Sequence, residues 1–486
     1  MLATSETTIF APVGLMTTIA HFGTFDVENY GDLLFTNIVN SRLSESECIP
    51  VSPIGGPPVW KDSAQSVGLC DLIGRHTEGV VIGGGNIIHP NKTPLTSYVR
   101  GGVDLYGYAD LWIGAALAAP EGTPVMWNAP GVPKPIPTEF IGLVRKALLR
   151  STYLSVRDEE SRRLLLDIQP DLEISVVPDS AWNLPSLWSK ESLDSEFETL
   201  TKGDAGPFFT IHVNDRYAKD IEYPKLASIL DKMAKKLNMR PILIGIGPCH
   251  NDDRLAGLIA SMMTSSPILV DRPLSTRQVC AAISRSNLYV GSSMHGYITA
   301  AAFGVPAFIV AKNLLKFKGV VSLTDAPETL VRSWKNLENT VYKSDFPKLS
   351  QTFMKKQVAA SEILDAHWTK IFSVLKNSRG SGPWSAEAVL RYRSQFLEAA
   401  CRAEARSVRE LKEIANRRRL KLQRSKKTIE SSPEMGKSRQ SSGDNPDPKK
   451  TNRPSPGIDQ PQRSSCGKPA LKKLFSRASK LLGSQR

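Results

Sequence analysis

The sequence NLYVGSSMHGYITAAAFGVPAFIV, residues 287–310, decides the fold class. Its first part, Asn287–Gly291, has the apolar character of a buried strand, and Met294–Phe303 is an alanine-rich helix that can lie close to a sheet. A second apolar strand follows at once. The polar turn before the helix places Ser292 and His295 at the carboxyl end of a parallel strand, where open α/β sheets bind ligands. A histidine that caps the turn or packs in the core is the alternative.

Strands and helices alternate in the same way over most of the chain. One series begins at 17–22 (TTIAHF), and a second begins at 208–214 (FFTIHVN), after a polar stretch at 184–206. This alternation is typical of parallel, doubly wound sheets. We therefore expect an α/β protein with two Rossmann-like domains, 1–195 and 205–380, whose strand ends face each other across a ligand-binding cleft.

Charge is distributed unevenly along the 486 residues. The net charge is +14, and residues 411–486 carry 20 Lys and Arg against 6 Asp and Glu, so the preceding residues are neutral overall. A neutral globular part has no nucleic-acid signature, and the tail is the basic surface. The six cysteines have no CxxC spacing, which argues against a zinc site or a disulfide scaffold and fits a cytosolic protein. We expect no signal peptide and no membrane-spanning segment.

Two polar loops follow predicted strands of the first domain. The loop after the first strand carries Asn29 and Asp32, which either cap the next helix or contact a ligand. The second loop, in GVVIGGGNIIH (79–89), has consecutive glycines that allow positive φ and close approach of a ligand to the backbone. It matches neither the GxGxxG fingerprint nor a P-loop. An anion or sugar site there would be formed by Gly83, Gly84, Gly85 and Asn86.

Charged residues near other strand ends are further candidates. Arg157, in LSVRDEES, is placed either to hold a carboxylate or phosphate with two N–H groups or to pair with Asp158 or Glu160. Asp179 either reaches the site or caps a helix. Lys316 either lines the floor of the cleft or is solvated. The sequence shows no cluster with metal-ligand spacing.

The C-terminal part extends the α/β body. We expect a long charged helix over 385–425, with an apolar seam that packs against the body or against a second subunit of a homo-oligomer. The Ser-, Pro- and Lys-rich stretch 426–468 is expected to be disordered. Residues 469–484 have the pattern of a basic amphipathic helix, suited to an anionic membrane surface or to docking on a protein.

The motifs ENYGDLL, VIGGGN, LSVRDEES, VVPDSAW and SMHGYITAAAFGVP, in this order over residues 17–320, resemble the polysaccharide pyruvyl transferase family. The resemblance implies a fold similar to the two-domain GT-B glycosyltransferases. It also implies transfer of the enolpyruvyl group of phosphoenolpyruvate to two hydroxyls of a sugar, in a cell-surface polysaccharide or its lipid-linked precursor, as a pyruvate ketal. Phosphoenolpyruvate is the donor in this chemistry, which requires no metal or other cofactor. We expect a cytoplasmic location, peripheral at the inner face of the membrane.

The resemblance also implies roles for the candidate residues. His295 would donate a proton or bind phosphate, because histidine titrates near neutral pH. Arg157 would hold the carboxylate or the phosphate of the donor. Asn29, Asp32 and the glycine loop would face the sugar acceptor. The predicted substrate-binding set is completed by Asn86, Ser292, Ser293 and Lys316.

One position departs from the family pattern. The family usually has Ser-Arg-Leu-His-Gly where this chain has SSMHG at 292–296. A phosphate ligand is therefore missing unless Arg277, Arg216 or Lys316 replaces it. Two other functions stay open. One is a glycosyltransferase that uses a nucleotide-sugar, with Asp271 as the acidic residue for the ribose, and the other is a non-catalytic, membrane-associated binding protein.

Overall fold

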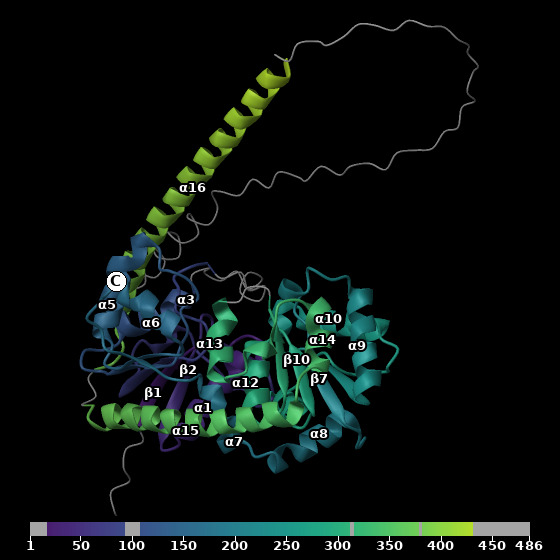
Figure 1. Cartoon of the computed structure of the whole chain (residues 1–486). Coiled ribbons are helices and arrows are strands. Elements are labelled where there is room, and N and C mark those ends of the chain that lie inside the picture. Colours follow the sequence, from purple (N-terminus) through teal and green to yellow (C-terminus); the bar gives the residue numbers. More distant parts are fainter. Residues whose placement is uncertain (1–16, 93–106, 312–314, 379–381, 431–486) are drawn as a thin grey trace, which may run out of the picture. The chain divides into compact units, whose positions relative to one another are not determined.

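Figure 1 shows the computed structural model of the protein, which describes residues 17–92, 107–311, 315–378 and 382–430. The chain divides into two compact units, and the first, which ends at Ile414, contains all the strands described below. The predicted α/β class with parallel sheets is confirmed. Within the described residues, no helix is both long enough and apolar enough to cross a membrane.

The first sheet is parallel and has the strand order β2-β1-β3-β4. A backbone bridge between Met126 and Tyr153 connects its edge to the pair β5-β6. Because β2 lies on one side of β1 and β3 on the other, the order reverses between β1 and β3, which makes this edge a topological switch point. The strands are β1 (Thr17–Phe22), β2 (Ser46–Val51), β3 (Gly79–Gly83), β4 (Val125–Asn128), β5 (Leu154–Val156) and β6 (Ile174–Val176).

The second sheet is parallel and has the order β12-β11-β10-β7-β8-β9. Its first strand in the chain, β7, pairs with β8 on one side and with β10 on the other, so the switch point lies between β7 and β10. The strands are β7 (Phe208–His212), β8 (Arg240–Ile244), β9 (Ile268–Val270), β10 (Leu288–Gly291), β11 (Ala307–Val310) and β12 (Leu330–Val331).

Helices connect the strands of both sheets. Those of the first half are α1 (Tyr30–Arg42), α3 (Gly107–Ala109), α4 (Ala115–Ala118), α5 (Ile141–Arg150) and α6 (Glu159–Leu166). The polar stretch between the sheets contains α7 (Leu184–Leu187) and α8 (Asp194–Thr201), and α8 packs against α11. Those of the second half are α9 (Tyr223–Leu237), α10 (Asp252–Met262), α11 (Thr276–Ser284), α12 (Met294–Ala302), α13 (Leu315–Leu323) and α14 (Trp334–Tyr342).

One apolar core is shared by the two sheets. Helix α1 buries Leu33, Leu34 and Ile38 in the same cluster as Ile211 of β7 and Ile298 of α12. This shared core fixes the distance between the strand ends of the two sheets, because apolar interiors are close-packed. A second apolar cluster contains residues of the first sheet alone, such as Phe22 and Trp127, and the predicted domain boundary at 195–205 stays a prediction.

Two long helices follow the sheets, α15 (Phe346–Lys376) and α16 (Ala386–Glu430). The predicted seam of α16 packs against the body of the first unit, because Val389, Tyr392 and Phe396 are buried in a cluster with residues of the first sheet. The helix reaches beyond 425, so the stretch predicted to be disordered from 426 is helical up to Glu430. The rest of that stretch and the predicted helix 469–484 lie outside the described residues.

A buried polar network ties α15 to the first sheet. His367 donates from Nε2 to Oδ1 of Asn128 at 3.2 Å, and the hydroxyl of Tyr153 donates to its Nδ1 at 2.9 Å. Ser180 donates to the same Asn128 oxygen at 2.6 Å. One ring nitrogen donates and the other accepts, so the network fits neutral imidazole. Burial accordingly lowers the pKa of His367 to about 4.

This network predicts a pH dependence of stability. His367 stays neutral in the folded protein down to about pH 4 but is protonated below about pH 6.5 when unfolded. The unfolded state binds more protons in this window, so the free energy of unfolding falls as pH is lowered from 6.5 to 4. We expect His367→Gln to flatten the slope by up to about 1.4 kcal/mol per pH unit in urea titrations. The exposed control His76→Gln should keep the wild-type slope, and equal slopes for the two variants would contradict the assignment.

Candidate functional site

A cavity of 240 Å³ lies where the carboxyl ends of the two sheets meet, and we call it the switch-point cavity. Its walls come from the loops after β1 and β3 in the first sheet and after β7, β8 and β10 in the second. Both topological switch points thus open into one space, as expected for ligand sites of open α/β sheets. Of the residues predicted from sequence, those that line it are Asn29, Asp32, Asn86, Ser292, Ser293 and His295.

His295 lies in the first turn of α12 and is held from two sides. Ser293 caps the helix, since its Oγ accepts a hydrogen bond from the backbone N–H of Gly296 at 3.2 Å. The imidazole lies so close to Gly31 of α1 that a Cβ atom there would be 1.9 Å from Nδ1. The edge of the Phe35 ring flanks it, with ring centroids 5.5 Å apart. The histidine therefore belongs to the interface between the two halves, and its chemical role stays a prediction.

Asp179 is the acidic partner of His295. Its Oδ2 lies 3.4 Å from Nε2 of His295 and 3.6 Å from Nη1 of Arg157, and its Oδ1 accepts from the backbone N–H of Ala181 at 3.1 Å. Burial would raise the pKa of this carboxyl, but the neighbouring His295 and Arg157 outweigh that effect and the pKa is lowered. Asp179 is therefore an ionised carboxylate beside the ring of His295.

Arg157 does not line the switch-point cavity. Its side chain is 4% exposed, forms ion pairs with Asp158 at 3.7 Å and Asp179 at 3.6 Å, and donates from Nη2 to Oδ1 of Asn86 at 3.1 Å. Gly131 leaves the room for it, because a Cβ atom there would be 2.6 Å from Nε. The ion pair with Asp158, which the sequence left open as an alternative to ligand binding, is thus present. In this structure Arg157 positions Asn86 and Asp179, and its role as a donor ligand stays a prediction.

The three glycines after β3 have positive φ of 112°, 54° and 73°, as a loop rich in glycine allows. Their missing side chains make room for protein neighbours: a Cβ at Gly84 would be 2.2 Å from the Phe35 ring, and one at Gly85 would be 3.0 Å from Asp32. Nε2 of His21 donates to the carbonyl of Gly83 at 2.9 Å. Gly83, Gly84 and Gly85 do not line the cavity, and the loop brings Asn86 into its wall.

Asn29 caps a helix, which is one of the two roles that the sequence left open, and its contact with a ligand stays a prediction. Its Oδ1 accepts from the backbone N–H of Gly31 at 3.2 Å and so caps α1, and the residue also lines the cavity. Asp32, in the first turn of α1, lines the same wall. Amide and carboxylate groups at this wall suit the hydroxyls of a saccharide.

A second histidine–aspartate pair, which sequence analysis missed, lines the opposite wall. Nε2 of His212 donates to Oδ2 of Asp252 at 2.7 Å, and Nδ2 of Asn214 donates to Oδ1 at 2.7 Å. The backbone N–H of Gly247 adds a third bond to the carboxylate at 3.1 Å. His212 and Asp252 are both buried. The signal in the sequence was a histidine inside the apolar strand FFTIH, at the second switch point.

The missing family arginine has one replacement candidate in the cavity wall. Arg216 lines the switch-point cavity. Arg277 lies elsewhere, with its guanidinium donating to the carbonyl of Ser192 and stacked 5.6 Å over the ring of Trp188. The side chain of Lys316 lies outside the described residues. Among the side chains that the structure describes, no group of three or more His, Cys, Asp or Glu is arranged to hold a metal ion.

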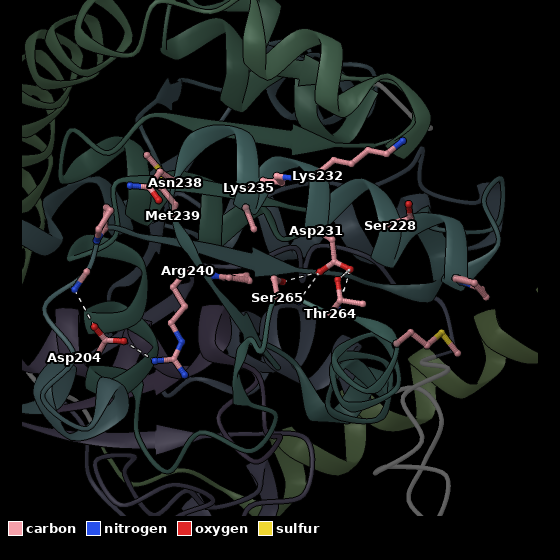
Figure 2. A pocket seen from close by; sticks show the side chains of 16 residues that line it. Asp204, Ser228, Asp231, Lys232, Lys235, Asn238, Met239, Arg240, Thr264 and Ser265 are labelled. Atoms are coloured by element: carbon pink, nitrogen blue, oxygen red, sulfur yellow. Dashed lines mark hydrogen bonds and ion pairs between the residues drawn. The ribbon is translucent and has the colours of Figure 1, made fainter.

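A larger hollow of 810 Å³ lies at the other end of the second sheet, and Figure 2 shows it from close by. Arg240, the first residue of β8, lines it and pairs with Asp204, so the hollow is at the amino ends of the strands. Asp231 accepts four hydrogen bonds from Thr264 and Ser265. Because α/β sheets bind ligands at the carboxyl ends of their strands, the smaller switch-point cavity is the candidate site.

Comparison of the sequence with family models gives one match, to polysaccharide pyruvyl transferase over residues 29–312, which is more than half of the chain. The chain belongs to the polysaccharide pyruvyl transferase family. The matched segment contains every residue of the switch-point cavity except Thr24. No curated protein sequence matches the chain.

Solved structures are similar to this pyruvyl transferase family member only in part. The S. aureus MnaA–UDP complex has 11% identity and a TM-score of 0.46, covering 75% of this chain and 99% of that one. UDP-GlcNAc 2-epimerase from Neisseria meningitidis, bound to UDP-GlcNAc, has 12% identity and a TM-score of 0.44, covering 79% and 100%. A variant of the wall teichoic acid polymerase TagF has 13% identity and a TM-score of 0.43, covering 74% and 89%.

The contact between α1 and His295 predicts the effect of a methyl group. Gly31→Ala should destabilise the protein by about 1–3 kcal/mol, because the added Cβ forces the His295 ring out of its position. Alanine is the better helix former, so helix propensity alone predicts the opposite sign. Urea unfolding measures the change. The control Gly142→Ala, in α5, meets no atom within 4 Å and should be neutral or stabilising. Equal stability of the two variants would show that His295 does not pack on α1 in solution.

Proposed function

We propose that the protein transfers the enolpyruvyl group of phosphoenolpyruvate to two hydroxyls of a sugar, in a cell-surface polysaccharide or its lipid-linked precursor, to form a pyruvate ketal. The observation that carries the proposal is the pairing of Asp179 with His295, which lies in the first turn of α12 and lines the same cavity as Arg216. Membership of the family supports transferase chemistry. Dependence on phosphoenolpyruvate is part of the proposal.

The donor has a carboxylate and a phosphate, and the second-sheet wall has matching groups. The N-terminus of α12 carries the positive end of the helix dipole, and Arg216 supplies a guanidinium that binds oxyanions with two N–H groups. Oγ of Ser292 is buried and has no hydrogen-bond partner among the described residues, which leaves it available as a donor. Ser293 is engaged as the helix cap. We place the phosphoenolpyruvate against this wall.

The proposed reaction has three proton transfers. Protonated His295, stabilised by Asp179, donates its proton to the methylene carbon of phosphoenolpyruvate, and a cation-like centre forms at C2. The first sugar hydroxyl attacks C2 and its proton passes to the now neutral His295. The C2–O bond to phosphate then breaks, the second hydroxyl attacks, and its proton leaves with the phosphate. The proton of the first hydroxyl thus replaces the one that His295 gave to the new methyl group, and the proton of the second hydroxyl ends on phosphate. The products are the ketal and inorganic phosphate.

The acceptor would lie against the first-sheet wall, where Asn29, Asp32 and Asn86 offer amide and carboxylate groups to its hydroxyls. A lipid-linked acceptor is consistent with the basic amphipathic sequence of residues 469–484, which we propose holds the protein peripherally on an anionic membrane. For the alternative function, transfer from a nucleotide-sugar, we expected Asp271 to contact the ribose of the nucleotide. Asp271 follows β9 and does not line the switch-point cavity.

Calorimetric binding of phosphoenolpyruvate to the purified protein tests the donor. We expect saturable binding that is about 10- to 100-fold weaker in Arg216→Gln, because a hydrogen bond to a charged group contributes about 1.5–3 kcal/mol. Arg277→Gln is the matched control, since that arginine lies outside the cavity, and it should bind like wild type. His295→Gln should bind the donor but release no phosphate with any saccharide of a test panel.

A panel of nucleotide-sugars is titrated in the same experiment. Binding of a nucleotide-sugar without binding of phosphoenolpyruvate would overturn the proposal in favour of glycosyl transfer. Binding of neither compound would favour a non-catalytic family member. Phosphate release by His295→Gln at the wild-type rate would refute the proton-transfer role of the histidine.

A further inference from the structure

A second hollow, of 360 Å³, adjoins the switch-point cavity on the second sheet, and we call it the outer hollow. It lies beyond the carboxyl ends of β7 and β8, between the loop at 214–216 and the start of α10. Asn214, Arg216 and His250 line both spaces. The two spaces are therefore neighbours that share these three residues as a common wall.

The outer hollow contains two guanidinium groups without partners. The side chains of Arg216 and Arg254 line it, and neither forms an ion pair or a hydrogen bond with another residue of the described chain. Both are exposed. Two positive charges in one hollow attract carboxylates. What the hollow can bind therefore depends on whether the nearby acidic residues are paired with other groups.

Two of the nearby carboxylates are committed to other groups. Asp252 accepts from His212 and Asn214 at 2.7 Å each. Asp253 pairs with Arg272 at 3.3 Å.

Another carboxylate, Asp215, lines the hollow and accepts from the hydroxyl of Tyr223 at 2.9 Å. Asp32 and Glu28 also lie close enough to act electrostatically on Cys249 of the lining. The lining thus has two arginines and one aspartate, with Leu255 and Leu258 as its apolar part. An anionic ligand would neutralise the excess positive charge.

We propose that the outer hollow binds a phosphate or diphosphate group carried by the acceptor saccharide. This inference rests on the proposed function, in which the switch-point cavity holds phosphoenolpyruvate. Arginine is suited to phosphate because its planar N–H groups match two phosphate oxygens. Arg254 would hold the phosphate of the acceptor, and Arg216, which we place against phosphoenolpyruvate, would lie between the two anionic groups. The sugar hydroxyls would then reach the donor over the shared wall of Asn214 and His250.

Two kinds of acceptor share this chemistry, a lipid diphosphate sugar and a nucleoside diphosphate sugar. Inorganic pyrophosphate is the probe for the shared group, geranyl diphosphate for the lipid form and UDP for the nucleoside form. Tighter binding of geranyl diphosphate or of UDP than of pyrophosphate identifies the source, and equal binding of all three assigns the site to the diphosphate alone. Each of these results supports the proposal.

The test is calorimetry of pyrophosphate binding to the full chain at saturating phosphoenolpyruvate. We expect saturable binding that is weakened at least about tenfold in Arg254→Gln, while phosphoenolpyruvate binding stays unchanged because Arg254 lines the outer hollow and not the cavity. Arg332→Gln, an exposed arginine outside both spaces, is the matched control and should bind both compounds like wild type.

The outcomes separate this inference from the proposed function. If phosphoenolpyruvate does not bind the wild-type protein, the proposed function fails. If it binds but excludes pyrophosphate competitively, the two compounds share one site and the inference is overturned. The same conclusion follows if the wild-type protein binds no diphosphate, or if Arg254→Gln binds pyrophosphate as tightly as the control variant does.

Discussion

The start of helix α1 packs directly on the second sheet, and the rest of the site depends on that contact. The backbone N–H of Tyr30 donates to the carbonyl of Ile246 at 2.9 Å, and its hydroxyl lies 2.9 Å from Oγ1 of Thr299. Gly31, the next residue, has no room for even a methyl group against His295. Each buried hydrogen bond contributes only about 1 kcal/mol, so the main effect is geometric. The strand ends of both sheets are held against each other, and the cavity is the space that remains.

This contact explains why the catalytic candidate lies between the two halves. His295 comes from the second sheet, whereas its partner Asp179 follows β6 of the first. The pKa of the carboxylate is lowered by His295 and, to a smaller extent, by Arg157, which is itself held by Asp158 and Asn86. Any change in the relative position of the sheets would alter the distance between His295 and Asp179. The proton-transfer chemistry that we propose is thus coupled to the packing of α1.

The sequence predicted the features that depend on local pattern. The alternation of apolar strands with helices predicted the parallel sheets, and the position of His295 after a strand predicted its place at the carboxyl end of that strand. The role of Arg157 could not be predicted in the same way. An arginine beside an aspartate at a strand end can pair with that neighbour, with a distant residue or with a ligand. Here the distant residue Asp179 and the space left by Gly131 favour an internal ion pair.

Pairings between distant residues were beyond sequence reasoning for the same reason. His212 and Asp252 are 40 residues apart and meet only because β7 and β8 are neighbours in the sheet. For the glycine loop, the sequence predicted a ligand next to the backbone, whereas the structure has protein side chains there. Glycines at positive φ suggest close approach of a ligand, but the space beside Gly84 is filled by Phe35, and Gly85 lies against Asp32. The pattern showed that something must come close to this backbone, and only the packing shows that the protein itself does.

The substitution at Ser293 has a consequence for the geometry of the donor. A serine at this position caps α12, which stabilises a helix start by about 1 kcal/mol, and an arginine could not make that bond. The positive charge in the cavity then comes from Arg216, after β7, and no longer from the turn after β10. Under the proposed chemistry the phosphate would lie nearer the end of β7. That position is next to the outer hollow. Arg216 would therefore lie between the phosphate of the donor and the anionic group that we assign to the acceptor.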